Sequence, residues 1–310
     1  MPPIKVVSVN LSEKVGTYKV PVDEATLDAR GLVGDAHAGD WHRQVSMLGK
    51  ASVERFTAKT GREVCPGEFA ENLLIDGADL AEACILDRFR IGGVELVVTQ
   101  IGKKCHGDDC VIFREVGQCV MPSEGVFCRV VSGGTVRAGD AGEHLPKTLD
   151  IRVITLSDRA EAGRYEDRSG PAVRTCLEEF FAETRWRLAV ENVLLPDDAD
   201  RLAAELAAAR DAGADAVFTT GGTGVGPRDV TPEVVTAFCD KLVPGITEHI
   251  RLKYGADKPN ALLSRSVAGL AGTMQVYALP GSVRAVNEYT TEILKTFEHV
   301  LQMAHGLDVH

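Results

Sequence analysis

After residue 150 the chain alternates between short apolar runs and helix-like runs, and this alternation restricts the fold more than any other feature. The strand-like segments are "IRVITLSD", "WRLAVENVLLPDD", "ADAVFTTGG" and "TMQVYALPG", and helical patterns such as "ADRLAAELAAARDAG" lie between them. Strands that alternate with helices form a mostly parallel sheet with helices on both faces. We therefore expect a three-layer α/β domain over residues 147–310.

The first half follows a different pattern. Its segments "IKVVSVNLS", "VSMLG", "FRIGGVELVVTQIG" and "GVFCRVVSGGTVRAGD" are rich in Val, Ile and Phe and are separated by glycine, and helical periodicity is clear mainly in "KASVERFTAKTG". Short strands bounded by glycine predict a mostly β, barrel-like domain over residues 1–146. The polar segment "AGEHLPKTLD", which contains proline, marks the boundary.

Charge and hydropathy exclude several classes of protein. The net charge is −11 and there is no basic tract, which argues against a nucleic-acid partner. No apolar run reaches the roughly 18 residues that a membrane span needs. The start "MPPIKVVSVN" lacks the basic and apolar regions of a signal peptide. We expect a cytoplasmic protein without a membrane partner.

Polar residues follow three predicted strands of the second half, in "LSDR" (156–159), "LPDD" (195–198) and "TTGGTG" (219–224). Ligands of parallel α/β sheets bind at the carboxyl ends of the strands, so we expect one site there. The glycines allow consecutive backbone N–H groups to form an anion-binding nest. The loop lacks the Lys-Ser/Thr ending of a P-loop and the GxGxxG spacing. A tight strand-to-helix turn is the alternative interpretation.

Asp229, which follows the glycine loop, favours a phosphate site that contains a metal ion. A carboxylate beside a phosphate repels it unless a cation lies between them, and Mg²⁺ is held by one or two carboxylates plus phosphate oxygens. Asp197, at the neighbouring strand end, could supply the second carboxylate. As alternatives, Asp229 complements a helix dipole and Asp197 is a turn residue. The helix that follows is expected to begin with Thr231 as its N-cap.

Five segments of the second half resemble the MoaB/Mog family, the molybdopterin adenylyltransferases. They occur in order as "SDRAEAGRYEDRSGPAV", "LLPDD", "TTGGTGVGPRDVTPE", "LLSRSVAG" and "ALPGSVRAVNE", within residues 151–305. The resemblance implies that this half transfers AMP from Mg-ATP to the terminal phosphate of molybdopterin and releases pyrophosphate. It also implies a homotrimer, and leaves open whether molybdenum or tungsten is inserted afterwards.

The same resemblance implies which residues form the site. The functional acids, which would also hold Mg²⁺, are Asp197 and Asp229. The residues that it implies for nucleotide or pterin binding are Ser157, Asp158, Gly221, Gly222, Thr223, Gly224, Ser264, Pro280, Gly281 and Ser282.

Most of the eight cysteines lie in the first half, and Cys105 in "TQIGKKCHGDDC" has the most reactive surroundings. Lys103, Lys104 and His106 beside it favour the thiolate, which is the nucleophilic and ligating form. A small buried hydrophobe is the alternative. Cys110 and Cys119 either support Cys105 or are inert. No CxxC pair occurs, so a structural zinc site has little support.

Four segments of the first half resemble a MOSC domain: "GLVGDAHAG…HRQVSML", "PGEFAENL", "TQIGKKCH" and "GVFCRVVSGGTVRAGD". The resemblance implies a β-barrel-like fold that binds molybdenum cofactor or carries sulfur on Cys105. We expect Arg43, Lys103 and Lys104 to contact an anion. A sulfur donor would be a separate protein, and whether this half transfers sulfur or only binds cofactor stays open.

Both halves point to molybdenum-cofactor biosynthesis, with a molybdenum enzyme as a downstream partner. Two alternatives to the enzyme remain: a non-catalytic carrier of molybdopterin or molybdenum cofactor, and a scaffold for other proteins of the pathway.

Overall fold

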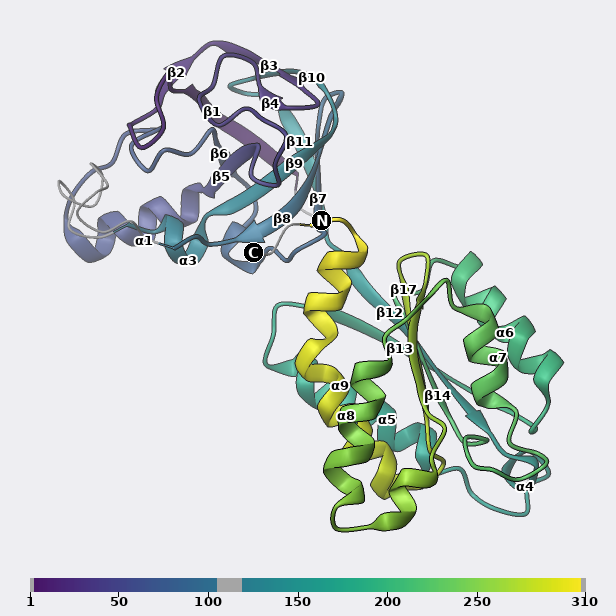
Figure 1. Cartoon of the computed structure of the whole chain (residues 1–310). Coiled ribbons are helices and arrows are strands. Elements are labelled where there is room, and N and C mark those ends of the chain that lie inside the picture. The colour runs from purple at the N-terminus through teal and green to yellow at the C-terminus, as the bar shows by residue number, and fades with distance from the viewer. Residues whose placement is uncertain (1–2, 105–118, 308–310) are drawn as a thin grey trace. The chain divides into compact units, whose positions relative to one another are not determined.

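The computed structural model describes residues 3–104 and 119–307 of the chain. The chain divides into two compact units, Met1–Lys147 and Thr148–His310 (Figure 1). None of the helices within the described residues is long and apolar enough to span a bilayer.

The N-terminal unit is a β-barrel, as the sequence predicted. In the described part of this unit, seven strands close into a ring because the first pairs with the last; in ring order they are β11 (Ala141–Leu145), β7 (Arg88–Ile91), β8 (Val94–Ile101), β9 (Val126–Ser132), β5 (Val45–Gly49), β6 (Leu73–Asp76) and β1 (Ile4–Leu11). The neighbours are antiparallel except for β5 and β6, which are parallel. Ile4 of β1 lies opposite Gly142 of β11 and closes the ring.

Shorter elements surround the barrel. The strand β2 (Val20–Val22) extends β1, and a small antiparallel sheet contains β10 (Gly134–Arg137), β3 (Glu24–Asp28) and β4 (Gly31–Leu32). The helical elements are α1 (Lys50–Thr60), η1 (Leu80–Glu82) and α3 (Met121–Glu124). Because β5 and β6 are parallel, the chain between them must cross over, and α1 lies in that crossover.

Alternate residues of the barrel strands fill its interior. In β1, Ile4, Val6 and Val9 are buried, and Val45 and Met47 of β5 belong to the same apolar cluster. A second cluster, which includes Phe56, Phe69 and Phe127, packs under α1. Cys128 of β9 is fully buried with its Sγ 3.5 Å from the Met47 sulfur, and burial raises the pKa of its thiol.

The C-terminal unit is a three-layer α/β domain with a mostly parallel sheet, again as predicted. The strands in spatial order are β13 (Arg187–Leu195), β12 (Thr148–Leu156), β14 (Ala216–Thr220), β17 (Met274–Leu279), β16 (Val267–Ala271) and β15 (Lys241–Leu242). The first four are parallel, and the last two are added antiparallel.

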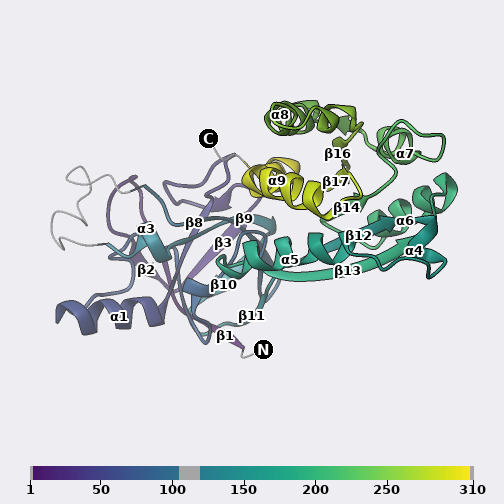
Figure 2. The same ribbon diagram turned by 90° about the horizontal axis from the view of Figure 1, so that it is seen from below.

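Helices cover both faces of this sheet (Figure 1). One face carries α6 (Ala199–Asp211) and α7 (Thr231–Phe238). The other carries α5 (Ser169–Ala182), α8 (Pro244–Gly255) and α9 (Val283–Ala304), and Figure 2 shows α8 next to α9. Two short elements, α4 (Asp158–Glu161) and η3 (Pro259–Leu263), follow the ends of β12 and α8.

Each face has its own core. Under α6, Leu202 and Leu206 pack against strand residues such as Val217 and Val276. On the opposite face, the Phe297 ring of α9 lies 5.6 Å from the ring of Phe181 in α5 and 6.4 Å from Phe218 in β14. The four parallel strands are therefore held between two apolar layers, and polar loops follow their carboxyl ends.

Candidate active site

A cavity of about 880 Å³ lies at the carboxyl ends of β12, β13, β14 and β17. Because these strands are parallel neighbours, the loops that follow them meet at one edge of the sheet. The cavity is lined by every residue that the sequence predicted for the C-terminal site, namely Ser157, Asp158, Asp197, Gly221, Gly222, Thr223, Gly224, Asp229, Ser264, Pro280, Gly281 and Ser282.

The glycine loop needs glycine at its first two positions. Gly221 has φ of +102° and Gly222 has φ of +62°, which L side chains rarely adopt. A Cβ on Gly221 would lie 2.3 Å from the Leu156 carbonyl oxygen, and one on Gly222 would lie 2.5 Å from the Thr231 Oγ1. The loop is therefore pressed against both the end of β12 and the start of α7.

Thr231 fixes the first two carbonyl groups of the loop. Its Oγ1 donates to the Gly221 oxygen at 2.9 Å, and its N–H donates to the Gly222 oxygen at 3.1 Å. The sequence predicted Thr231 as the N-cap of α7, and this prediction was wrong. The N-cap is Val230, and the Thr231 hydroxyl bonds backward to the glycine loop instead of to its own helix.

Arg265 fixes the next part of the loop, and the sequence did not single it out. Its backbone N–H donates to the Thr223 oxygen at 2.9 Å, and its Nε donates to the Gly224 oxygen at 2.6 Å. Its Nη2 donates to the Asp229 carbonyl oxygen at 2.8 Å. The available signal was its place directly after Ser264, but nothing in that order of residues shows which carbonyl groups it reaches.

Unlike the carbonyl groups of the loop, three of its backbone N–H groups have no hydrogen-bond partner among the described residues. Across residues 3–104 and 119–307, no hydrogen bond satisfies the N–H groups of Gly222, Thr223 and Gly224. Consecutive free N–H groups with their carbonyl groups held elsewhere form a concave site for an anion. The loop therefore offers a cavity-lining nest of backbone donors.

The two predicted acids lie on different loops of the cavity. The Asp197 Oδ2 accepts from the N–H of Asp158 at 3.1 Å, and the Asp229 Oδ2 accepts from the N–H of Gly226 at 2.7 Å. Within the described residues, the other oxygen of each carboxylate has no hydrogen-bond partner. Each acid is thus held by one oxygen and keeps the second for a ligand.

This donor set suits Mg²⁺ that is bound together with phosphate. Mg²⁺ prefers oxygen ligands and usually combines one or two carboxylates with substrate phosphates and water. No cluster of three or more His, Cys, Asp or Glu side chains that could hold a metal occurs in the described part of the chain. Asp197 and Asp229 would therefore need ligand oxygens to complete a coordination shell.

Asp158 joins two sides of the cavity. Its Oδ1 accepts from the N–H of Asp197 at 3.0 Å, so the two acidic residues bond reciprocally. Its Oδ2 also pairs with Arg228 of the glycine loop at 2.7 Å. Both side chains of this ion pair are substantially exposed, at 66% for Arg228 and 45% for Asp158, so water screens it.

Several polar residues of the cavity have structural partners. Asp167, which the sequence analysis missed, accepts from Thr155 Oγ1 at 2.7 Å and from the N–H groups of Ser169 and Gly170 at the start of α5. The Ser282 Oγ accepts from Ala285 N–H and caps α9. The signal for Asp167 was its position two residues before the start of the helix, in "EDRSGP".

In the N-terminal unit, Arg43 lies near two aromatic rings. Its guanidinium carbon is 4.8 Å from the centre of the Trp41 ring and 5.9 Å from that of Phe127. Its Nε is buried and has no partner among the described residues. Next to it, the His42 Nε2 lies 2.9 Å from the Gln100 Oε1, which ties this loop to the end of β8.

The two lysines that we expect to contact an anion follow β8 in the chain. Lys103 is partly buried and Lys104 is exposed. Cys105 and Cys110 lie outside the described residues. Burial lowers the pKa of Lys19, the hydrogen bond to Asp35 opposes this shift, and the positive charge of Lys103 adds to it.

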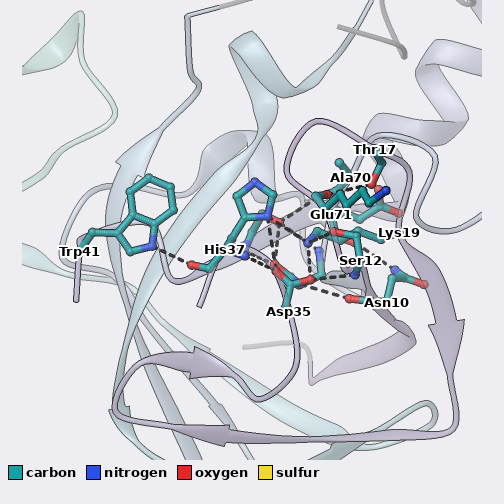
Figure 3. A network of polar contacts seen from close by, with 12 residues as sticks. Asn10, Ser12, Thr17, Lys19, Asp35, His37, Trp41, Ala70 and Glu71 are labelled. Carbon is teal, nitrogen blue, oxygen red and sulfur yellow. Dashed lines mark hydrogen bonds and ion pairs between the residues drawn. The ribbon is translucent and has the colours of Figure 1, made fainter. Parts of the chain in front are cut away.

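Lys19 belongs to a buried polar network (Figure 3). Its Nζ donates to Asp35 Oδ2 at 2.5 Å and to Ser12 Oγ at 3.3 Å, and lies 3.3 Å from His37 Nδ1. The His37 Nδ1 also lies 3.4 Å from Asp35 Oδ1, so this ring nitrogen faces both the ammonium and the carboxylate of the network. The His37 oxygen accepts from the Trp41 indole at 2.7 Å, which connects this network to the Arg43 site.

Glu71 is the second acid of this network and is almost fully buried. Its Oε1 accepts from the Gly67 N–H at 2.6 Å, and its Oε2 has no partner within the described residues. Burial raises the pKa of Glu71 to about 7, although the charge of Lys19 acts in the opposite direction.

Comparison with known proteins matches each half separately. Residues 152–299 match a family model described as a probable molybdopterin binding domain, and residues 34–143 match the MOSC domain. A molybdopterin adenylyltransferase of Helicobacter pylori is 32% identical over 161 residues, which is 52% of this chain and 90% of the relative. One from Pyrococcus furiosus is 34% identical over 51% of this chain and 93% of its own length.

Among solved structures, the molybdopterin biosynthesis enzyme MoaB from Thermus thermophilus is 33% identical, covers 51% of this chain and 98% of its own chain, and has a TM-score of 0.47. Both resemblances seen in the sequence are confirmed by the family models. The chain therefore belongs to the family of the molybdopterin adenylyltransferases and their molybdopterin binding domain through its second half, and carries a MOSC domain in its first half.

Proposed function

We propose that the C-terminal unit transfers AMP from ATP to the terminal phosphate of molybdopterin and releases pyrophosphate. The main support is one cavity that combines a nest of free backbone N–H groups with two carboxylates that each keep a free oxygen. Relatives at 32% and 34% identity are named for this activity.

The reaction is a displacement at the α-phosphorus of ATP. An oxygen of the pterin phosphate forms the new bond, and the bond from the α-phosphorus to the oxygen that bridges to the β-phosphorus breaks. Pyrophosphate leaves with that electron pair. A phosphate is already a nucleophile at neutral pH, so no strong base is required. This agrees with the described lining of the cavity, which includes no histidine.

The protein therefore contributes positioning and charge neutralisation. The N–H groups of residues 222–224 would hold nucleotide phosphates. Asp197 and Asp229 would hold Mg²⁺, which neutralises phosphate charge as it develops. The free oxygens of the two carboxylates are the groups available for this contact.

Asp229→Asn tests the role of the acid. The Asn Oδ1 can still accept from the Gly226 N–H, so the loop keeps its shape while the negative charge is lost. We expect adenylylation to be lost and molybdopterin binding to be retained. The assay incubates purified protein with molybdopterin, ATP and Mg²⁺ and follows pyrophosphate and adenylylated pterin.

Near-normal turnover by Asp229→Asn would show that this carboxylate does not hold the metal. A wild-type protein that binds molybdopterin but forms no product would instead be a carrier. Partner binding that is unaffected by either acid, without product, would favour the scaffold.

We further propose that the N-terminal unit binds molybdenum cofactor or carries sulfur, with Arg43, Lys103 and Lys104 as contacts for the anionic cofactor and Cys105 as the sulfur carrier or ligand. The support is the buried Nε of Arg43, which has no partner among the described residues, and the position of Lys103 two residues after the end of β8. The full chain and its Cys105→Ser variant should differ in retained cofactor or in protein-bound persulfide. If both measurements are equal, Cys105 has neither role.

A further inference from the structure

Arg265 contacts the carbonyl groups of the glycine loop and does not line the cavity. Ser264, its neighbour in the chain, lines the cavity, whereas Arg265 is not among the residues that line it. Its guanidinium group contacts the Gly224 and Asp229 carbonyl oxygens and the Glu233 carboxylate. The side chain is 37% exposed, so it is not a core residue.

We infer that Arg265 is a positioning residue that keeps the glycine loop in its anion-binding form without touching the ligand. The inference rests on the phosphate-binding role proposed for the loop. Each carbonyl oxygen of residues 221–224 accepts a hydrogen bond: the first two accept from Thr231 and the last two from Arg265. With the carbonyl groups held in this way, the N–H groups of residues 222–224 stay free to bind an anion.

The loop needs such a restraint because glycine peptides rotate easily. A rotated peptide would exchange an N–H group for a carbonyl oxygen at the cavity and would repel a phosphate. The hydrogen bonds to Thr223 and Gly224 oppose this rotation, and the bond to the Asp229 oxygen holds the far end of the loop. The loop is therefore organised before a ligand arrives, which removes an ordering cost from binding.

Only an arginine side chain can make these three contacts at once. The planar guanidinium group presents several donors in fixed directions, so Nε and Nη2 reach two carbonyl groups while Nη1 pairs with Glu233. A lysine keeps the charge but cannot make this arrangement of contacts. Arg265→Lys therefore separates the shape of the loop from the local charge.

The test compares the full chain with Arg265→Lys and with Arg251→Lys as a matched control. Arg251 also donates to a backbone carbonyl, that of Ser266 at 3.2 Å, but does not line or brace the glycine loop. Calorimetry measures the binding of Mg-ATP, inorganic pyrophosphate and molybdopterin. Steady-state kinetics measure KM for ATP and for molybdopterin, and hydrogen exchange follows the amides of residues 221–229.

For Arg265→Lys we expect binding of ATP and pyrophosphate to weaken by about tenfold or more. The KM for ATP should rise, the KM for molybdopterin should stay within about twofold, and exchange in the loop should become faster. Arg251→Lys should leave all of these values close to those of the wild type.

Three results would overturn the inference: unchanged pyrophosphate binding in Arg265→Lys, unchanged exchange in the loop, or an equal loss of ATP and molybdopterin binding together with a lower unfolding temperature. The outcome is separate from that of the proposed reaction. If the wild type binds pyrophosphate but forms no adenylylated product, the proposed reaction fails while weaker binding by Arg265→Lys still supports the inference. If the wild type binds neither ATP nor pyrophosphate, both fail.

Discussion

Gly221 combines an unusual backbone conformation with close packing, and the two effects can be separated by mutation. Gly221→Ala would place its Cβ 2.3 Å from the Leu156 oxygen at φ of +102°. Gly213, two residues after the end of α6, also has positive φ, at +81°, but nothing lies within 4 Å of a Cβ there. We expect Gly213→Ala to destabilise the protein by about 1–2 kcal/mol through strain alone.

Gly221→Ala should cost more than Gly213→Ala because the backbone must also move away from Leu156. Urea unfolding of both variants measures the difference. Equal stabilities would show that the loop adapts without cost, and that close packing does not restrict this position.

Glu71 should make the stability of the N-terminal unit depend on pH. The pKa of Glu71 is raised to about 7 by burial, above the ordinary value of about 4.3 for an unfolded chain. The folded state then binds the extra proton between these values, so this contribution to stability is full below about pH 4 and is lost as pH rises through 7. Glu71→Gln should flatten this decline.

Chemical denaturation between pH 4.5 and 8 measures the effect, and the wild type and Glu71→Gln should differ most above pH 7. Glu63→Gln, at an exposed position, serves as the control and should keep the slope of the wild type. A wild-type protein with the same slope as Glu71→Gln would mean that Glu71 ionises normally in the folded state.

At this scale the sequence predicted the residues that face the cavity better than those that support it. Asp197, Asp229 and the glycines follow strands directly, so strand order alone brings them together. Arg265 and Asp167 act on backbone groups that are distant in the chain or belong to a neighbouring turn. Such partners depend on tertiary packing and have no periodic signal.

At the level of secondary structure, the sequence predicted the alternating strands and helices but not the elements outside this alternation. The alternation of strands and helices correctly predicted the parallel part of the sheet, because β12, β13, β14 and β17 are apolar runs separated by helices. The antiparallel pair β16 and β17 was not predicted; only residues 272–273 separate the two strands. The helix α8 begins at Pro244–Gly245, a dipeptide that by itself indicates a turn.

In the barrel, the run "FRIGGVELVVTQIG" forms two strands. The chain turns at Gly92 and Gly93 between β7 and β8, and Gly92 has φ of +56°. The tight glycine turn allows the two strands to pair antiparallel. Closure of the ring could not be predicted from residue order, since it depends on pairing between residues separated by most of the unit.

Ion pairs centred on Glu292 connect α8 to α9. The Glu292 Oε1 lies 2.7 Å from Lys253 Nζ of α8 and 2.8 Å from Lys295 Nζ of α9. Burial opposes ionisation of Glu292, but the hydrogen bonds from both lysines outweigh it and lower its pKa to about 2. This stabilisation is present above the ordinary pKa of a glutamate and is lost as pH falls toward 2.

Glu292→Gln should therefore destabilise the C-terminal unit at pH 7, and the difference from the wild type should shrink as the pH falls from 4 toward 2. Thermal unfolding across this range measures it. Glu248→Gln, at an exposed position of α8, should have little effect. A constant difference at all pH values would assign the loss to packing rather than to the charge of Glu292.

At the scale of the whole molecule, the second half should work alone. The Helicobacter pylori relative is covered over 90% of its length by 52% of this chain, so in that organism a protein little longer than this half is named as the enzyme. We expect residues 148–310 to fold and to adenylylate molybdopterin at the rate of the full chain, and light scattering should show for both the homotrimer that the family resemblance implies. An aggregated or inactive fragment would mean that this unit needs the barrel.

The pairing of β1 with β11 has a consequence for synthesis of the chain on the ribosome. Ile4 leaves the exit tunnel long before its partner Gly142, because most of the barrel unit is made between them. At a translation rate of about 5–20 residues per second, the first strand waits on the order of ten seconds for its neighbour. During that time an apolar strand edge is open to other nascent chains or chaperones, whereas the second unit starts to emerge only when the barrel is able to close.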